Sequence, residues 1–142
     1  MAKQGTYFED LSVGDTAEAT FPVTEKVIVT FAEVSQDDNP VHLDEDFART
    51  TQFGTRIAHG MLSAGFISAV IGTKLPGYGS IYLSQTLRFR RPVKIGDEVT
   101  VRATVTALDA DKGRATIETV ALVGGKPVVE GEALVMPPRR SA

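Results

Sequence analysis

The sequence contains no cysteine and only two histidines among its 142 residues. The absence of cysteine excludes a disulfide framework, a cysteine-ligated zinc and a cysteine nucleophile. Two histidines are also too few for a histidine-rich metal site. Basic residues do not outnumber acidic ones, and the formal net charge is −3. We therefore expect no resident metal and no nucleic-acid partner, because nucleic-acid binders usually carry a clear basic excess.

Long apolar stretches are missing as well. Residues 1–5 contain no apolar signal core. The longest apolar run, 57–72, is interrupted by small residues and serines, and it is shorter than the roughly 20 residues that span a bilayer. We expect a soluble, cytoplasmic protein without a membrane segment. The length and the apolar content of 42% predict a single domain over 1–142 with a loose polar tail from about 137 to 142.

Two stretches carry helical patterns. Thr24 is a suitable N-cap for the first helix. The apolar positions of this helix are three or four residues apart: Val27, Ile28, Phe31, Ala32 and Val34. This helix must stop near residues 35–38, because Pro40 has no N–H donor and disfavours helical backbone at the residue before it. The second helix is predicted over 57–74 and is apolar on nearly every side, which predicts burial on every side.

Beyond the second helix the pattern changes to alternation with a period of two. Four strands are predicted, over residues 81–90, 99–107, 114–123 and 127–135. Gly124-Gly125 is typical of a tight hairpin between the last two. The order of elements favours an α+β fold in which a curved antiparallel sheet wraps around a long central helix. Because one sheet covers only part of a helix that is apolar all round, we expect a homodimer.

Acid–base groups are concentrated in one short stretch after the first helix. Asp37 and His42 lie five residues apart across a loop that contains a proline. Such a loop can bring a carboxylate and an imidazole to one water, from which they take one proton while delivering another to a substrate. Asn39 can orient either group through hydrogen bonds. The structural alternative is that Asp38 and Asn39 cap and turn the chain and that His42 is a satisfied core or surface histidine.

His59 and Gly60 begin the second helix and are a second candidate site. A helix N-terminus offers unpaired N–H groups and the positive end of the helix dipole, which can stabilise a carbonyl oxygen that gains negative charge. Alternatively, Gly60 only permits close packing and His59 is structural. Further along this helix, Ser68 and Ile71 either line an acyl channel or pack in the core.

The motifs around these residues follow one another in a particular order. They are Phe31–His42 with its Asp-x-Asn-Pro-x-His end, Ala48, Ile57-Ala-His-Gly-Met61, Gly79-Ser-Ile-Tyr-Leu83, Arg91-Pro-Val93 and Gly96-Asp-Glu-Val99. This order resembles the (R)-specific enoyl-CoA hydratases, also called MaoC-like dehydratases. Gln36 stands where the family often has glycine, and Asp38 where a bulkier apolar residue is expected. Neither departure removes a catalytic group.

The resemblance implies a hot-dog fold, a homodimer, an acyl-CoA substrate and no metal or redox cofactor. Asp37 and His42 would hold the catalytic water, and the N–H of Gly60 would bind the thioester carbonyl. The residues assigned to substrate binding are Asn39, His59, Met61, Ser68 and Ile71. The implied reaction is the reversible addition of water to trans-2-enoyl-CoA, giving (R)-3-hydroxyacyl-CoA.

Three alternatives to this reaction stay open. The chain could be an acyl-CoA thioesterase, a 3-hydroxyacyl-carrier-protein dehydratase or a non-catalytic acyl-thioester-binding module. The presence of Asp37, Asn39 and His42 together argues against the last of these, because binding alone needs no acid–base pair.

Overall fold

A computed structural model describes residues 4–140. Within these residues, six antiparallel strands form one sheet in the order β1-β4-β5-β6-β2, and the short β3 also pairs with β6. The strands are β1 (Thr16–Pro22), β2 (Ile81–Gln85), β3 (Arg88–Phe89), β4 (Glu98–Asp109), β5 (Arg114–Val123) and β6 (Lys126–Met136). The helices are η1 (Phe8–Asp10), α1 (Glu25–Ser35), α2 (Pro40–Leu43), α3 (Glu45–Ala48) and α4 (Gly60–Thr73).

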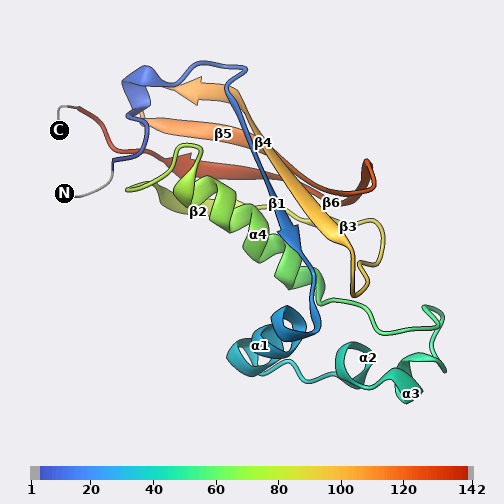
Figure 1. The fold of residues 1–142 in the computed structure, drawn as a ribbon. Coiled ribbons are helices and arrows are strands. Elements are labelled where there is room, and N and C mark those ends of the chain that lie inside the picture. The colour runs from blue at the N-terminus through green and yellow to red at the C-terminus, as the bar shows by residue number, and fades with distance from the viewer. Residues whose placement is uncertain (1–3, 141–142) are drawn as a thin grey trace.

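The core lies between the sheet and α4. Figure 1 shows α4 running along one face of the curved sheet, and α4 packs against β1, β4, β5 and β6. Alternate residues of β4 are fully buried on this face: Val99, Val101, Ala103 and Val105. From the helix, Ile67, Val70 and Ile71 pack into the same apolar cluster. The predicted α+β hot-dog fold is confirmed, because a period of two on the strands buries one face of the sheet against one helix.

The strand predictions are confirmed with one difference. Gly124 and Gly125 have φ values of 57° and 77°, as a tight two-residue hairpin requires. The single strand predicted over 81–90 is divided into β2 and β3. The pairing of β2 with β6 shifts register at a bulge between Tyr82 and Ser84. A bulge of this kind breaks the regular ladder and bends the strand, which the alternation of side chains does not reveal.

The helix α1 ends where it was predicted to end, but its burial differs from the prediction. Thr24 caps it, and the Thr24 hydroxyl accepts the N–H of Val27 at 3.1 Å. On this helix Ile28 and Ala32 are buried, whereas Val34 is 80% exposed. The buried face of α1 is therefore narrower than the apolar spacing suggested.

A short helix, α2, replaces the loop that was predicted to carry His42. Pro40 occupies its first turn, where a missing N–H costs nothing, and Asn39 caps it. Figure 1 shows α1, α2 and α3 gathered beyond the N-terminal end of α4, away from the sheet. We call residues 25–56 the overhanging segment. It carries Asp37 and His42 and places them near the start of α4.

In the single chain α4 is exposed along one side, as expected of a helix that one sheet covers only in part. Its exposed residues recur at spacings of three or four and include Met61, Gly65, Ser68 and Gly72. The helix also begins at Gly60 rather than at residue 57. Ile57 forms an isolated β-bridge with Lys94, and the N–H of Ala58 donates to the carbonyl of Val93, so these residues are held in extended backbone.

The two ends of the described chain lie together. The N–H of Phe8 donates to the carbonyl of Pro138, and the Arg140 guanidinium pairs with Asp10. A loose tail was expected over 137–142, but residues 137–140 are held by these contacts, and 141–142 lie outside the described residues. Over residues 4–140, the helices are too short or too polar to cross a bilayer.

Candidate functional site

Asp37 and His42 meet beside His59. One carboxylate oxygen of Asp37 and one ring nitrogen from each histidine lie within 4.8 Å of one another. Gln36 makes this possible, because it adopts a left-handed conformation (φ 63°) that ends α1 and turns the chain toward α2. Asp37 is exposed, whereas only 8% of the His42 surface is accessible. The structure therefore brings together the two residues predicted to act as an acid–base pair.

The hydrogen bonding of His42 defines which nitrogen is free. His42 Nδ1 lies 2.8 Å from the carbonyl oxygen of Ile57, which can only accept, so Nδ1 carries the hydrogen. Nε2 then keeps its lone pair. Burial lowers the pKa of His42, and the neighbouring His59 lowers it further, against the opposing effects of the Ile57 carbonyl and the Asp37 carboxylate. His42 is consequently a neutral proton acceptor near pH 7.

The distance between the two acceptors suits a bridging water. A water about 2.8 Å from each of two acceptors can join atoms that are up to about 5.6 Å apart. A carboxylate oxygen of Asp37 and one of the two ring nitrogens of His42 fall within that limit, at 4.8 Å or less. Both groups accept, so they can take both hydrogens of one water and leave its oxygen lone pairs free to attack.

Asn39 has a capping role and also orients Asp37. Its Oδ1 accepts the N–H of Val41 at 3.2 Å, which caps α2. Its backbone N–H donates to Asp37 Oδ1 at 3.2 Å. The capping interpretation of Asn39 is confirmed, and the same residue holds one carboxylate oxygen of Asp37 in place.

His59 lies beneath the pair and is 2% exposed. Its Nε2 donates to the backbone carbonyl of Asp37 at 2.9 Å. Its ring stacks on that of His42, with 3.8 Å between centroids and 26° between planes, and it tilts against Phe31 at 4.8 Å. Nδ1 of His59 is buried and has no hydrogen-bond partner.

The three side chains of Asp37, His42 and His59 are also a possible metal-binding cluster, but their geometry is unfavourable. One nitrogen of each imidazole already donates to a backbone carbonyl. The lone pairs of the other two nitrogens lie in the ring planes, and the two planes are stacked only 26° from parallel. Ligands of one ion must instead converge on it at about 2.0–2.1 Å.

Gly60 is the first residue of α4, so its N–H has no acceptor within the helix. The aromatic ring of Phe89 lies directly over its Cα. A Cβ built on Gly60 would lie 2.6 Å from Cε1 of Phe89, which is closer than real side chains approach. Close packing against Phe89 is therefore one reason for a glycine here, and Phe89, which is 52% exposed, lines the cavity beside Gly60.

A cavity of about 480 Å³ opens next to Gly60, between the start of α4 and the segment that follows β3. Its lining is Phe53, Ile57, Ala58, His59, Gly60, Met61, Ser63, Phe89, Arg90, Arg91, Pro92, Val93 and Val129. Its volume suits part of a small ligand. Asp37 and His42 are not among these residues, but His59 both lines the cavity and contacts the pair.

The remaining predicted substrate-binding residues are dispersed. Met61 lines the cavity and is largely exposed. Ser68 is exposed on the outer side of α4, and Ile71 is buried in the core. The core alternative is therefore confirmed for Ile71 and wrong for Ser68. Neither residue lines the cavity of the single chain.

Sequence reasoning missed Arg56, which ties the overhanging segment together. Its Nε donates to the carbonyl of His42 at 2.7 Å, and its two terminal nitrogens donate to both oxygens of Glu25 at 2.7 and 2.9 Å. The guanidinium lowers the pKa of Glu25 through this side-chain bond. Arg56 thus links α1 to α2, and nothing in its neighbourhood along the chain marks it for that role.

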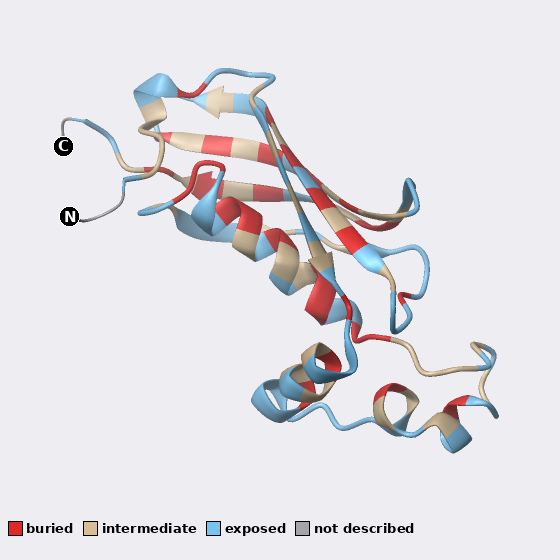
Figure 2. Ribbon diagram, in the orientation of Figure 1, coloured by how far each residue is buried: buried red, intermediate tan, exposed pale blue. Residues whose placement is uncertain are grey.

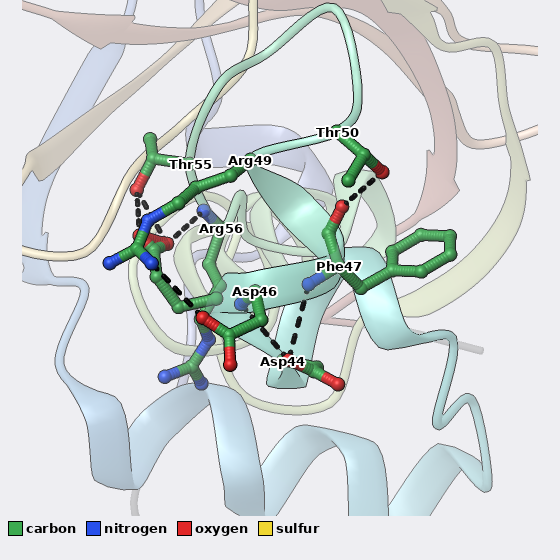
Figure 3. Close-up of polar contacts among 8 residues, drawn as sticks. Asp44, Asp46, Phe47, Arg49, Thr50, Thr55 and Arg56 are labelled. Carbon is green, nitrogen blue, oxygen red and sulfur yellow. Dashed lines mark hydrogen bonds and ion pairs between the residues drawn. The ribbon is translucent and has the colours of Figure 1, made fainter.

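Glu45 anchors the other end of the segment. Its carboxylate accepts the hydroxyl of Thr55 at 2.8 Å and the N–H of Arg56 at 2.9 Å. These two bonds, with the Arg56 N–H first, lower the pKa of Glu45. Figure 3 shows Thr55 and Arg56 beside α3, whose first amides, those of Asp46 and Phe47, bond to Asp44. The position of His42 therefore depends on a network of directed polar contacts.

Comparison with known proteins gives consistent matches. A family model described as MaoC like domain matches residues 12–126. The chain is 55% identical to an (R)-specific enoyl-CoA hydratase of Rhodospirillum rubrum, over 94% of this chain and 93% of the relative. It is 51% identical to a 3-hydroxybutyryl-CoA dehydratase of Methylorubrum extorquens, over 94% and 85% respectively. Its structure matches the unliganded R-hydratase PhaJ1 of Pseudomonas aeruginosa with a TM-score of 0.91 at 50% identity, over 96% of this chain and 88% of that one.

Proposed function

The chain belongs to the family of MaoC-like domains, and we propose that it is an (R)-specific enoyl-CoA hydratase. The reaction is the reversible addition of water to a trans-2-enoyl-CoA, which gives an (R)-3-hydroxyacyl-CoA. The observation that carries this proposal is the meeting of Asp37 with the neutral, Nε2-free form of His42 at a distance that suits one shared water. The relatives at 55% and 51% identity are named for the two directions of this type of reaction.

The acid–base pair does the proton chemistry. As the water oxygen bonds to C3 of the enoyl group, one O–H bond of the water breaks and its proton passes to the pair. The pair returns a proton to C2, so that H and OH are added and the pair ends in its starting state. Asn39 holds Asp37 and Ile57 holds His42 during these transfers, which preserves the alignment that fast proton transfer requires.

The N-terminus of α4 stabilises the other end of the reacting system. The thioester carbonyl gains negative charge as C3 is attacked. The free N–H of Gly60 and the positive end of the α4 dipole can hold that charge without reorganisation. The chemistry consists of proton transfers and hydrogen bonding alone, so we propose that it needs no metal or redox cofactor.

Crotonyl-CoA and the purified protein provide the test. We expect loss of the enoyl chromophore without release of free thiol. Asp37→Asn and His42→Ala should each lower kcat by about 10²–10⁴-fold, the range typical of a positioned acid or base. Circular dichroism and thermal unfolding of both variants check that the loss is chemical.

Each alternative function has its own result in this assay. Thiol release without loss of the alkene would contradict the hydratase proposal and identify a thioesterase. Hydration of a carrier-protein thioester but not of the CoA thioester would identify the carrier-protein dehydratase. Inertness toward enoyl thioesters of every chain length would leave a binding module.

We also propose that the protein is a homodimer. The edge strand β2 exposes Ile81, Tyr82 and Leu83, and the outer side of α4 exposes Met61 and Ser68. Exposed apolar side chains on an unpaired edge strand are normally covered by a partner. Such a partner would also cover the exposed side of α4, so that Ser68 would line an enclosed path for the acyl chain. Analytical ultracentrifugation should give twice the 15.2 kDa chain mass, and a monomer would contradict the proposal.

A further inference from the structure

His59 contacts both members of the acid–base pair and lies directly before Gly60, whose N–H is the proposed carbonyl-binding amide. It bonds to the backbone of Asp37 and stacks on His42, and it directly precedes Gly60 in the chain. At 2% exposure it is almost sealed from solvent. Its position suggests a part in keeping the two halves of the site aligned.

The two members of the pair are attached to the body very differently. His42 is tied to residues 56–57 by bonds that do not involve His59. Its Nδ1 donates to the carbonyl of Ile57, and its own carbonyl accepts Nε of Arg56. The adjacent Val41 carbonyl accepts the N–H of Ile57. His42 would therefore stay in place if His59 were changed.

Asp37 has no comparable attachment. Its N–H donates to the hydroxyl of Ser35, and its carboxylate accepts the N–H of Asn39, so both bonds stay within five residues of the chain. Residues 36–40 are all exposed. Over residues 4–140, the bond from His59 is the one hydrogen bond that ties Asp37 to the α4 side of the site.

We infer that His59 is a positioning residue that fixes Asp37 relative to His42 and to the N–H of Gly60 through its Nε2–H···O=C bond. This inference rests on the proposed hydratase function of the same site. A carbonyl can only accept, so the bond requires a hydrogen on Nε2 of His59, and the buried Nδ1 is then a lone-pair acceptor without a donor. His59 thus acts through Asp37 and does not itself touch the reacting atoms.

Two substitutions separate the bond from the ring. His59→Gln keeps an N–H donor near the position of Nε2 but loses the stacked ring. His59→Phe keeps a ring between Phe31 and His42 but loses the donor. We expect kcat for crotonyl-CoA to fall about 100-fold in His59→Phe with little change in KM, as a misplacement of about 1 Å can cause. His59→Gln should stay within about tenfold of the wild type, because a lost aromatic pair costs little.

A double-mutant cycle tests whether His59 acts through Asp37. If it does, His59→Phe should lower the residual activity of Asp37→Asn by less than about threefold. A purely structural role would instead lower activity by the same factor in both backgrounds. Equal losses for His59→Gln and His59→Phe, or additive losses with Asp37→Asn, would overturn the inference.

Histidine NMR supplies a readout that needs no substrate. The chain has only two histidines, so ¹⁵N-labelled histidine gives two ring systems, and each His59 variant assigns the remaining one to His42. We expect His59 to carry its hydrogen on Nε2 and His42 to carry it on Nδ1. A hydrogen on Nδ1 of His59 would overturn the inference. A wild-type protein that is inert toward enoyl thioesters, but shows the expected tautomers, would count against the proposed function alone.

Discussion

The sheet with α4 and the overhanging segment are stabilised in different ways. Figure 2 shows buried residues alternating along β4, β5 and β6 and recurring along α4, and most of them are aliphatic. Over the 32 positions 25–56, by contrast, the buried residues are Ile28, Ala32, His42 and Ala48. The segment depends on directed contacts from Arg56 and Glu45 instead. Apolar burial stabilises the body, and hydrogen bonds define the geometry of the segment.

This difference separates stability from catalysis. Apolar burial scales with area and tolerates small shifts, whereas a hydrogen bond weakens steeply with distance and angle. The acid–base pair lies in the region held by hydrogen bonds, where Asp37 can remain exposed to substrate. The substitutions below should therefore divide into those that unfold the protein and those that misplace its reactive groups.

The largest effect on stability is expected in the body. Ile67 of α4 is fully buried among the strands, so Ile67→Ala should lower the free energy of unfolding by about 2–5 kcal/mol. Urea unfolding measures this change. Below the transition, kcat should remain close to that of the wild type. A loss of activity greater than the loss of folded protein would show that the two regions are coupled.

Arg56→Lys should act on the overhanging segment. Lysine cannot replace both the bidentate contact with Glu25 and the Nε bond to the carbonyl of His42. We expect the free energy of unfolding to fall by about 1–3 kcal/mol, since hydrogen bonds to charged groups contribute in this range. Activity should fall further than stability predicts.

Glu25→Gln is the matched control for Arg56→Lys. The Glu25 side chain is mostly exposed, and the substitution leaves the Arg56 bond to the His42 carbonyl intact. The free energy of unfolding should therefore fall by less than about 1 kcal/mol. A larger activity loss in the control than in Arg56→Lys would contradict this account of the segment.

Gly60→Ala tests the junction between the two regions. The new Cβ would press on Phe89, but that ring is half exposed and can turn outward, so the stability loss should be near the low end of the about 1–3 kcal/mol typical of overpacking. The displaced ring and the methyl group should narrow the approach to the Gly60 N–H and lower kcat/KM.

The double variant Gly60→Ala with Phe89→Ala separates two reasons for the glycine. Removing the ring should restore stability, because the clash is with Phe89 alone. If the methyl group also blocks the ligand, kcat/KM should stay low. Full recovery of activity would mean that a glycine is needed at this position only for packing against Phe89, since alanine keeps the backbone N–H.

The smallest effect concerns pH. The folded-state pKa of His42 lies below its ordinary value of 6.5, mainly because of burial. Above pH 6.5 the His42 imidazole is neutral in both the folded and the unfolded protein, so its contribution to the free energy of unfolding is fully present. As the pH falls from 6.5 through the folded-state pKa, the unfolded chain binds the proton first and stability is lost.

Urea unfolding at about pH 7.5 and about pH 5.5 measures this loss, and His42→Gln should lack it. The carboxylates of Glu25 and Glu45 have lowered pKa values and add their own loss only at more acidic pH. The acid limb of kcat/KM should likewise have its midpoint below 6.5, because the neutral form of His42 is the active one. A midpoint above 6.5 would contradict the lowered pKa of His42.

The predictions from sequence were accurate where a repeating pattern carried them. Alternation predicted β4, β5 and β6, and Gly124-Gly125 predicted the hairpin between β5 and β6. The Asp37 and His42 pair was recognised from its spacing and from the family motif. The bulge in β2 and the short helix α2 were missed, because neither changes the order of polar and apolar residues.

Contacts between residues far apart in the sequence could not be predicted in the same way. The ring of Phe89 over Gly60 joins residues 29 positions apart, and Arg56 reaches back 31 positions to Glu25. Sequence patterns report which face of an element is apolar. They do not report which polar atom a long side chain will reach, since that depends on how whole elements pack.

The amino-acid sequence by itself determined an antiparallel sheet around an apolar helix and an acid–base pair after a helix-ending turn, because both depend on local periodicity and local backbone chemistry. Only the tertiary structure decided the tautomer of His42, the exposed side of α4 and the position of His59 beneath the pair. These depend on the distances between groups remote in the chain, and such distances are set by packing rather than by neighbours in sequence.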